Sequence, residues 1–324
     1  MDIYKLTDFG TQEIIKGSRA DYGRKRNLRL VKSDWLSFVD NKIGAAKAFQ
    51  ASYGFDENAF LQKYGLRAVQ FGNWMKYGDR ADHFLALVEA LAHLSFILGT
   101  DNIGWYNKLS IAIGARGHSE AKGHFEPYYN IINLTKQKGG HSFAHEYGHA
   151  IDYIGGEYYC KSARSYSISY AHYTSTVKEN AGLNEVRNLM NIVLDGVRSG
   201  ERYTKLEKWS KSQGRFSYWC CNTEIWARTF AQWVALECKK KKIIDTVLCE
   251  KVDTGSLANI SEKELEKLSP YIKKLVGHCV DFLKNGKPVP TAVKTKNPFD
   301  KPAEPMKKAA SKKAAGKQLN LFNK

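Results

Sequence analysis

The sequence lacks the long apolar segments that membrane proteins carry. None of its apolar runs approaches the roughly 18–20 residues that a membrane-spanning helix needs. Residues 1–30 are rich in charge and contain no apolar segment typical of a secretory signal. The six cysteines include no C-x-x-C pair, and the adjacent Cys220 and Cys221 suit neither a disulfide framework nor a zinc ribbon. We therefore expect a reduced, cytoplasmic protein with no membrane partner.

Acidic residues are scarce relative to basic ones. The chain has 50 Lys and Arg against 33 Asp and Glu, a net charge of +17. This excess predicts attraction to a polyanion, with nucleic acid the first candidate and an anionic membrane surface the second. The densest basic run spans residues 16–32, and we expect Arg24, Lys25, Arg26 and Arg29 to contact DNA phosphates without sequence preference. The alternative is a solvated helix face.

Proline is almost confined to one end of the chain, and its distribution divides the sequence. Residues 284–324 hold five of the seven prolines, 11 lysines, and no Trp or Tyr, so we predict a disordered basic tail. The rest has the composition of a globular protein, with 43% hydrophobic and 12% aromatic residues over the whole chain. We expect a basic helical region at 1–60 and one folded domain at 61–283.

Periodicity separates helices from strands inside that domain. β-branched and aromatic residues predict two strands, at 109–115 and 124–135, paired antiparallel. Ser142 is the expected N-cap of the helix that follows. The order of elements predicts an α+β fold with a small antiparallel or mixed sheet and a helical C-terminal lobe. Helical patterns occur at 81–98, 142–153, 183–197, 226–236 and 262–282.

The motif with the clearest chemistry is His145-Glu146-Tyr147-Gly148-His149, an H-E-x-x-H sequence. Residues four apart share one face of a helix, so both imidazoles can reach the same metal ion. Glu146 then lies beside the ion, where it can act as the catalytic base toward a water molecule. The motif follows a Gly-Gly turn and opens an apolar helix. It therefore predicts a zinc site with His145 and His149 as ligands.

Such a site needs a third protein ligand. Glu224 lies 75 residues after His149, at the start of a run whose apolar stripe can pack on the first helix. Asp152 and Glu157 are the rivals; a ligand as near as Asp152 would crowd the histidines, so we expect it to orient an imidazole by hydrogen bonding. Trp219 and Tyr218 could bring an indole or a phenol near the metal, although a structural role is the simpler interpretation.

Five short motifs follow one another along the middle of the chain: F-G-N-W-M at 71–75, S-I-A-I-G-A-R-G at 110–117, H-F-E-P at 124–127, I-N-L-T-K at 132–136 and A-H-E-Y-G-H-A-I-D at 144–152. This series resembles the zincin-like metallopeptidase domains of polyvalent proteins, which phages and conjugative elements encode. The E-x-x-A-x-x-F-A run from Glu224 is similar to the ligand-bearing helix of ImmA/IrrE-type gluzincins. The resemblance implies a zincin-like fold, Glu224 as the third zinc ligand, and a protein that acts on or near DNA in a bacterial host cell.

The last residues of the predicted tail contain a second motif. Gln318, Leu319, Leu321 and Phe322 match the Q-L-x-L-F peptide by which bacterial polymerases and repair proteins bind the β sliding clamp. A flexible tail would present three apolar anchors to a preformed pocket, while the Gln318 amide fixes the register. The alternative is an accidental apolar end to a tail of lysine and alanine.

These features together predict a zinc metallopeptidase of the gluzincin type, encoded by a mobile element. Its expected substrates are proteins associated with DNA or the replication machinery, and its expected location is the bacterial cytoplasm, at DNA or the replisome. Two alternatives stay open. One is a catalytically inactive zincin-like module that binds DNA or the clamp; the other is a regulatory protease that cleaves a repressor.

Overall fold

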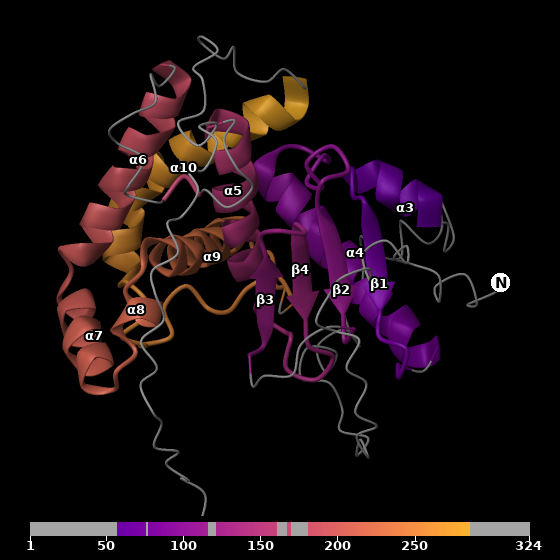
Figure 1. Cartoon of the computed structure of the whole chain (residues 1–324), viewed down its shortest axis with the longest axis horizontal. Helices are drawn as coiled ribbons and strands as arrows, with labels where there is room; N and C mark the ends of the chain where they lie inside the picture. The colour runs from indigo at the N-terminus through magenta and orange to yellow at the C-terminus, as the bar shows by residue number, and fades with distance from the viewer. Residues whose placement is uncertain are drawn as a thin grey trace, which may run out of the picture. The chain divides into compact units, whose positions relative to one another are not determined.

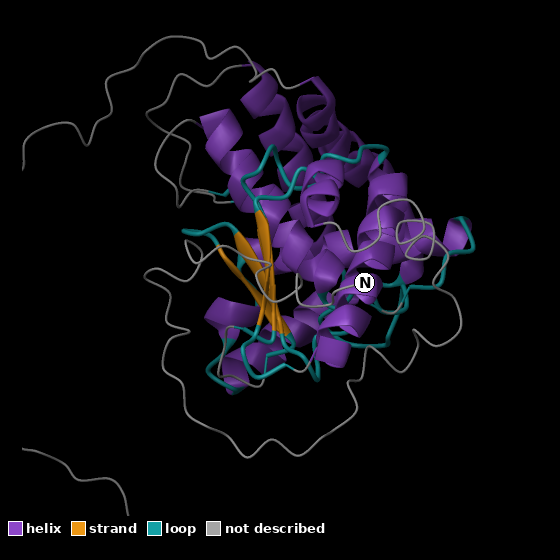
Figure 2. Cartoon of the chain, turned by 90° about the vertical axis from the view of Figure 1, so that its right-hand side faces the viewer, coloured by secondary structure: helices purple, strands orange, loops and turns teal. Residues whose placement is uncertain are grey.

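The computed structural model describes residues 57–75, 77–115, 121–160, 167–169, 181–245 and 247–285. All of these belong to one compact unit. The predicted DNA contacts at Arg24, Lys25, Arg26 and Arg29 lie outside the described residues. So does the clamp-like motif with Gln318, Leu319, Leu321 and Phe322. The described part is helix-rich with one small sheet, which agrees with the predicted α+β class (Figures 1 and 2).

The sheet has four short strands in the order β1-β2-β4-β3. β1 (Ala68–Phe71) pairs in parallel with β2 (Ser110–Ile113), and β2 pairs in parallel with β4 (Ile131–Leu134). β3 (Gly123–Glu126) pairs antiparallel with β4 and forms the edge nearest α9 in Figure 1. Every residue of β2 and β4 is buried, as the apolar S-I-A-I and I-I-N-L sequences of inner strands require.

The predicted antiparallel pairing of residues 109–115 with 124–135 is wrong. The second segment is not one strand but a hairpin, in which the turn 127–130 joins β3 to β4. Asn130 takes a positive φ of 51° there, and the N–H of Tyr129 donates to the carbonyl of Glu126 at 3.2 Å. The reversal places β4 beside β2 with the same direction. Pro127 and Asn130 are typical turn residues, but the strand-forming Tyr128 and Tyr129 lie between them, so the segment resembles one continuous strand.

Two helices pack along each other behind the sheet and position the site. α5 (Phe143–Cys160) begins directly after Ser142, whose carbonyl accepts the N–H of Glu146 at 3.0 Å. α9 (Asn222–Lys240) runs beside it. The two helices approach most closely at Gly148, where an added Cβ would lie 3.0 Å from the Cα of Ala227. The indole N–H of the buried Trp226 donates to the carbonyl of Gly148 at 2.9 Å.

The remaining helices complete the core. α4 connects the parallel strands β1 and β2, and α10 packs on α6 and α9. None of the described helices is long and apolar enough to cross a membrane. Their bounds are α3 Glu57–Tyr64, α4 Tyr77–Leu98, α6 Ala181–Arg198, α7 Glu201–Ser212, α8 Phe216–Trp219 and α10 Glu262–Asn285.

Candidate metal centre

Three side chains that the sequence proposed as metal ligands meet at the α5–α9 contact. The Nε2 of His149 lies 3.3 Å from Glu224 Oε1, and the Nε2 of His145 lies 3.6 Å from Glu224 Oε2. The two imidazole rings are nearly perpendicular, with centroids 5.0 Å apart. One ligand atom from each residue can be chosen so that all lie within 4.8 Å of one another. The cluster can therefore hold a metal ion.

The donor set fits a small divalent cation. Nitrogen and oxygen ligands about 2.0–2.2 Å from a tetrahedral ion are separated from each other by about 3.4 Å. The 3.3 Å and 3.6 Å separations are close to this value; they join His149 and His145 to different oxygens of Glu224, and a set with one ligand atom from each residue lies within 4.8 Å. Two imidazoles and one carboxylate supply three ligands, which leaves one tetrahedral position for water or substrate.

The protonation states of the cluster favour metal binding. Burial and the neighbouring His149 lower the pKa of His145 to about 3, so its lone pair is free at neutral pH. Burial also acts to lower the pKa of His149, but the hydrogen bond and charge of Glu224 outweigh it, and that pKa is raised. The pKa of Glu224 is lowered, because the contacts with both histidines outweigh the opposing effect of burial. A cation at the centre would replace the proton that His149 and Glu224 share.

Glu146 lies beside the cluster, between α5 and the edge strand. Its side chain is buried, and burial raises its pKa to about 7, although His149, His124 and the N–H of Phe125 act in the opposite direction. A Cβ at Gly123 in β3 would come within 3.1 Å of Glu146 Oε1, so the strand passes the carboxylate at a distance that suits glycine. A buried carboxylate that titrates near neutrality is suited to accept and release a proton.

An open cleft of about 370 Å³ gives access to His145, Glu146 and Glu224. Tyr218 and Trp219 line it from α8, although the sequence favoured a structural role for both. Burial raises the pKa of Tyr218, and the nearby carboxylates of Glu224 and Glu146 raise it further, which places the phenol near the metal cluster. Its other lining residues come from β3, the start of α5, α9 and the loop that follows α9, and include Lys122, Gly123, Arg228, Gln232, Lys251 and Asn259.

Arg228 is a functional candidate that the sequence analysis did not identify. It lies one helical turn after Glu224, and its Nη1 is 3.5 Å from Glu224 Oε2. Its Nη2 donates to the carbonyl of Trp219 at 2.5 Å, and the guanidinium lies over the Trp219 ring, 5.6 Å from the centroid. Arg228 thus holds the carboxylate in position from behind. The i, i+4 spacing of Glu and Arg in α9 was the available signal.

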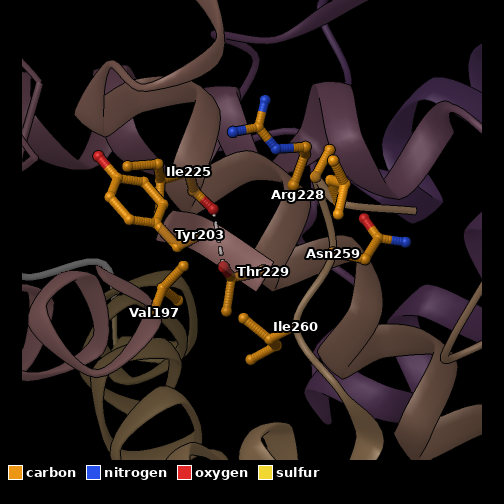
Figure 3. Close-up of a pocket in the computed structure, with 9 residues that line it drawn as sticks. Val197, Tyr203, Ile225, Arg228, Thr229, Asn259 and Ile260 are labelled. Carbon is orange, nitrogen blue, oxygen red and sulfur yellow. Dashed lines mark hydrogen bonds between the residues drawn. The ribbon is translucent and has the colours of Figure 1, made fainter. Parts of the chain in front are cut away.

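Figure 3 shows a second, smaller cavity, which Arg228 and Asn259 line as well as the cleft. Tyr203, Ile225 and Thr229 line it, and the Thr229 hydroxyl donates to the carbonyl of Ile225 at 2.7 Å. Its volume of about 10 Å³ holds at most one water molecule. It is therefore too small for a substrate, and the cleft at Glu146 is the candidate site.

Asp152 does not form the expected hydrogen bond with a ligand imidazole. Its buried carboxylate instead accepts the N–H of Ser169 at 2.8 Å and the Ser169 hydroxyl at 2.6 Å. The Nδ1 of His149 is buried without a hydrogen-bond partner. Burial raises the pKa of Asp152 to about 6. The role predicted for Asp152 is therefore corrected: the carboxylate is held by Ser169 and makes no hydrogen bond to His149.

The other alternative ligand, Glu157, lies two turns beyond His149 in α5. Its carboxylate pairs with the Nζ of Lys108 at 3.1 Å, away from the cluster. His124 in β3 contacts Glu126 at 3.4 Å and lies near enough to Glu146 to act on the pKa of that carboxylate. Of the three carboxylates that the sequence left open as the third ligand, the structure brings Glu224 to the histidines.

Comparisons with protein-family models, with curated proteins and with solved structures gave no match to this chain. The function of the cleft is therefore inferred from its own residues.

Proposed function

We propose that the chain is a zinc-dependent metallopeptidase of the gluzincin type. The observation that carries this proposal is the meeting of His145, His149 and Glu224 beside the buried Glu146 in one open cleft. A purely structural metal site would not need Glu146, whose pKa is raised to about 7 by burial. Zinc is favoured because two imidazoles, one carboxylate and an open position form the ligand set that catalytic zinc uses.

The proton transfers are assigned to Glu146. A bound zinc ion would polarise the scissile carbonyl and make the attacking water more acidic. Glu146 accepts one proton from that water as its oxygen adds to the carbonyl carbon, and delivers the proton to the nitrogen when the C–N bond breaks. A pKa near neutrality allows both steps at the same carboxylate. Tyr218, which borders the cluster, can donate its phenolic hydrogen to the oxyanion that develops on the carbonyl.

We assign the binding of the substrate peptide to β3, the edge strand of the sheet. Among the described residues, β3 pairs only with β4, and its Gly123 lies against the Glu146 carboxylate. An extended peptide would add to this free edge by backbone hydrogen bonds, which bring a peptide bond past Glu146 without requiring a particular sequence. Lys122 and Gly123 also line the cleft, so the edge strand and the cleft are continuous.

The choice of protein substrates rests on the sequence. The net charge of +17 and the tail motif support action on proteins bound to DNA or to the replication machinery of a bacterial host. The resemblance to polyvalent proteins supports a mobile element as the source. DNA and the β sliding clamp remain predicted partners.

The decisive experiment combines metal analysis with a peptidase assay on casein and mixed fluorogenic peptides. Wild-type protein should contain about one zinc per chain, and Glu146→Gln should keep this zinc while hydrolysis falls by about 10²–10⁴-fold. Glu224→Ala should lose both the zinc and the hydrolytic activity. Glu157→Gln, which disrupts only the pair with Lys108, is the matched control and should keep both. A Glu146→Gln variant with full activity, or wild-type protein that binds no metal, would refute the proposal.

A further inference from the structure

The surface beside the cleft is formed by α7, α8 and the turn between them, residues 201–219, which we term the α7–α8 corner. It exposes three large aromatic side chains: 41% of Trp209, 39% of Phe216 and 53% of Tyr218. Residues 211–218 are all exposed. In Figure 1 the corner lies at the edge of the molecule, where α8 leads into α9. Aromatic rings so close together on a surface indicate a contact with another molecule.

These rings are held in place by the protein. Trp219 contacts two of them, with its ring centroid 5.7 Å from that of Trp209 and 5.2 Å from that of Tyr218, both in edge-to-face arrangements. Trp219 is in turn held by the guanidinium of Arg228. The Nζ of Lys211 lies 5.1 Å from the centroid of the Phe216 ring. Because these side chains are already ordered, a ligand that stacks on them binds with little cost in conformational entropy.

The corner is also basic. Its five basic residues outnumber its two acidic residues, which gives a net charge of +3. Glu201 and Glu207 each pair with a lysine one turn later, while Lys208 and Arg215 form no ion pair with any described residue. Positive charge is thus distributed among the exposed rings. The basic residues are Arg202, Lys205, Lys208, Lys211 and Arg215.

We propose that the α7–α8 corner binds single-stranded nucleic acid. Bases stack on the exposed rings of Trp209, Phe216 and Tyr218, and Lys208 and Arg215 contact the phosphates. Proteins that bind single strands without sequence preference combine preformed aromatic surfaces with positive charge. A duplex keeps its bases stacked inside, so it can use only the charges. The polar residues between the rings, and the four-residue length of α8, do not provide the continuous apolar face that a membrane-bound helix needs.

This binding goes beyond the proposed peptidase activity and does not depend on the metal. Tyr218 and Trp219 line the cleft as well as the corner, so a strand bound at the corner passes the mouth of the cleft. A protein attached to that strand would be presented to Glu146. The corner thus supplies a physical reason for a preference for proteins on single-stranded nucleic acid.

The test measures fluorescence anisotropy of a labelled oligothymidylate of about 16 nucleotides with the full-length chain. A duplex of equal length is measured in parallel. The Trp209→Ala, Phe216→Ala double variant should bind the single strand at least about tenfold more weakly, because each of the two lost stacking contacts contributes about fivefold or more. Binding of the duplex, which uses charge alone, should be unchanged. Phe96→Ala is the matched control. Like the corner residues, Phe96 is an exposed aromatic residue (62%) with a lysine, Lys241, over its ring, but it lies on α4.

A second measurement addresses the charges. Arg215→Ala should weaken single-strand binding and lower the slope of log affinity against log salt by about 0.7. All variants are first compared with wild type by thermal unfolding, because both aromatic side chains are exposed and their removal should leave the fold intact. Glu146→Gln protein should bind the single strand as wild type does. This result separates the proposal from the fate of the peptidase assignment.

Three results would overturn the proposal. The first is equal single-strand affinity of the double variant and wild type. The second is a higher KM of the double variant for peptide substrates with unchanged oligonucleotide binding, which would make the corner a peptide subsite. The third is a double variant that loses binding to phosphatidylserine vesicles but binds the oligonucleotide as wild type does, which would make the corner a membrane contact.

Discussion

Two regions of the molecule use the same aromatic residue types for opposite purposes. At the α5–α9 contact, Trp226 and Phe230 are fully buried and fix the spacing of the helices that carry the metal ligands. At the α7–α8 corner, Trp209 and Phe216 remain about 40% exposed. The first region sets the geometry of the cluster, whereas Trp209 and Phe216 in the second do not line the cleft. Substitutions at these residues can therefore separate the packed part from the surface part.

The largest difference between the two regions should appear when one tryptophan is removed from each. Trp226→Ala should lower the free energy of unfolding by about 3–5 kcal/mol, because it leaves a cavity and the Gly148 carbonyl loses its donor. Trp209→Ala should cost about 1 kcal/mol, the contribution of its contact with Trp219. Urea denaturation followed by circular dichroism measures both. Equal losses would show that the corner is part of the core.

A smaller difference is expected between two glycine substitutions in helices, which should change stability in opposite directions. Gly148→Ala should destabilise the protein by about 1–2 kcal/mol, since the new methyl group would meet the backbone of Ala227 at 3.0 Å and 3.3 Å. Gly277→Ala in α10 should stabilise it by about 0.5–1 kcal/mol, because an added Cβ there meets no atom within 4 Å. Chemical denaturation of the two variants tests the sign. Stabilisation by Gly148→Ala would mean that α5 and α9 can separate without cost.

How readily a feature can be predicted depends on how far apart in the sequence the residues that form it lie. The H-E-x-x-H ligands are four residues apart on one helix, so local geometry sufficed for His145 and His149. The sheet depended on pairings that composition cannot reveal, and the hairpin turn at 127–130 was read as part of a strand. The partner of Asp152 is Ser169, 17 residues later and outside any predicted element. The choice of Glu224 required the resemblance to gluzincins as well as its helical position.

The smallest expected effect concerns pH and the loop that supports α5. His93 Nδ1 lies 2.8 Å from Asp245 Oδ2, and Asp245 also accepts the N–H groups of Val247 and Leu248. Burial opposes protonation of His93, but the hydrogen bond and charge of Asp245 outweigh it, and the pKa is raised. A raised histidine pKa stabilises the fold below the ordinary value of about 6.5 and loses this contribution as pH rises through the folded-state pKa.

We therefore expect the melting temperature of wild type to fall slightly more than that of His93→Gln between about pH 6 and pH 8. Lys211→Gln at the corner is the control, because the hydrogen bond with Glu207 raises the pKa of Lys211, which lies far above this interval. Differential scanning calorimetry at constant ionic strength measures the three profiles. Parallel profiles for wild type and His93→Gln would show that the Asp245 contact makes no net contribution to stability.

The separation of the ligands along the chain has a consequence for synthesis. His145 and His149 leave the ribosome 75 residues before Glu224. At about 5–20 residues per second, the two histidines wait roughly 4–15 s for the third ligand. A complete ligand set exists only after α9 has emerged and docked on α5. The nascent chain therefore carries His145 and His149 before the cluster can form, and the proposed peptidase activity would begin only once α9 is in place.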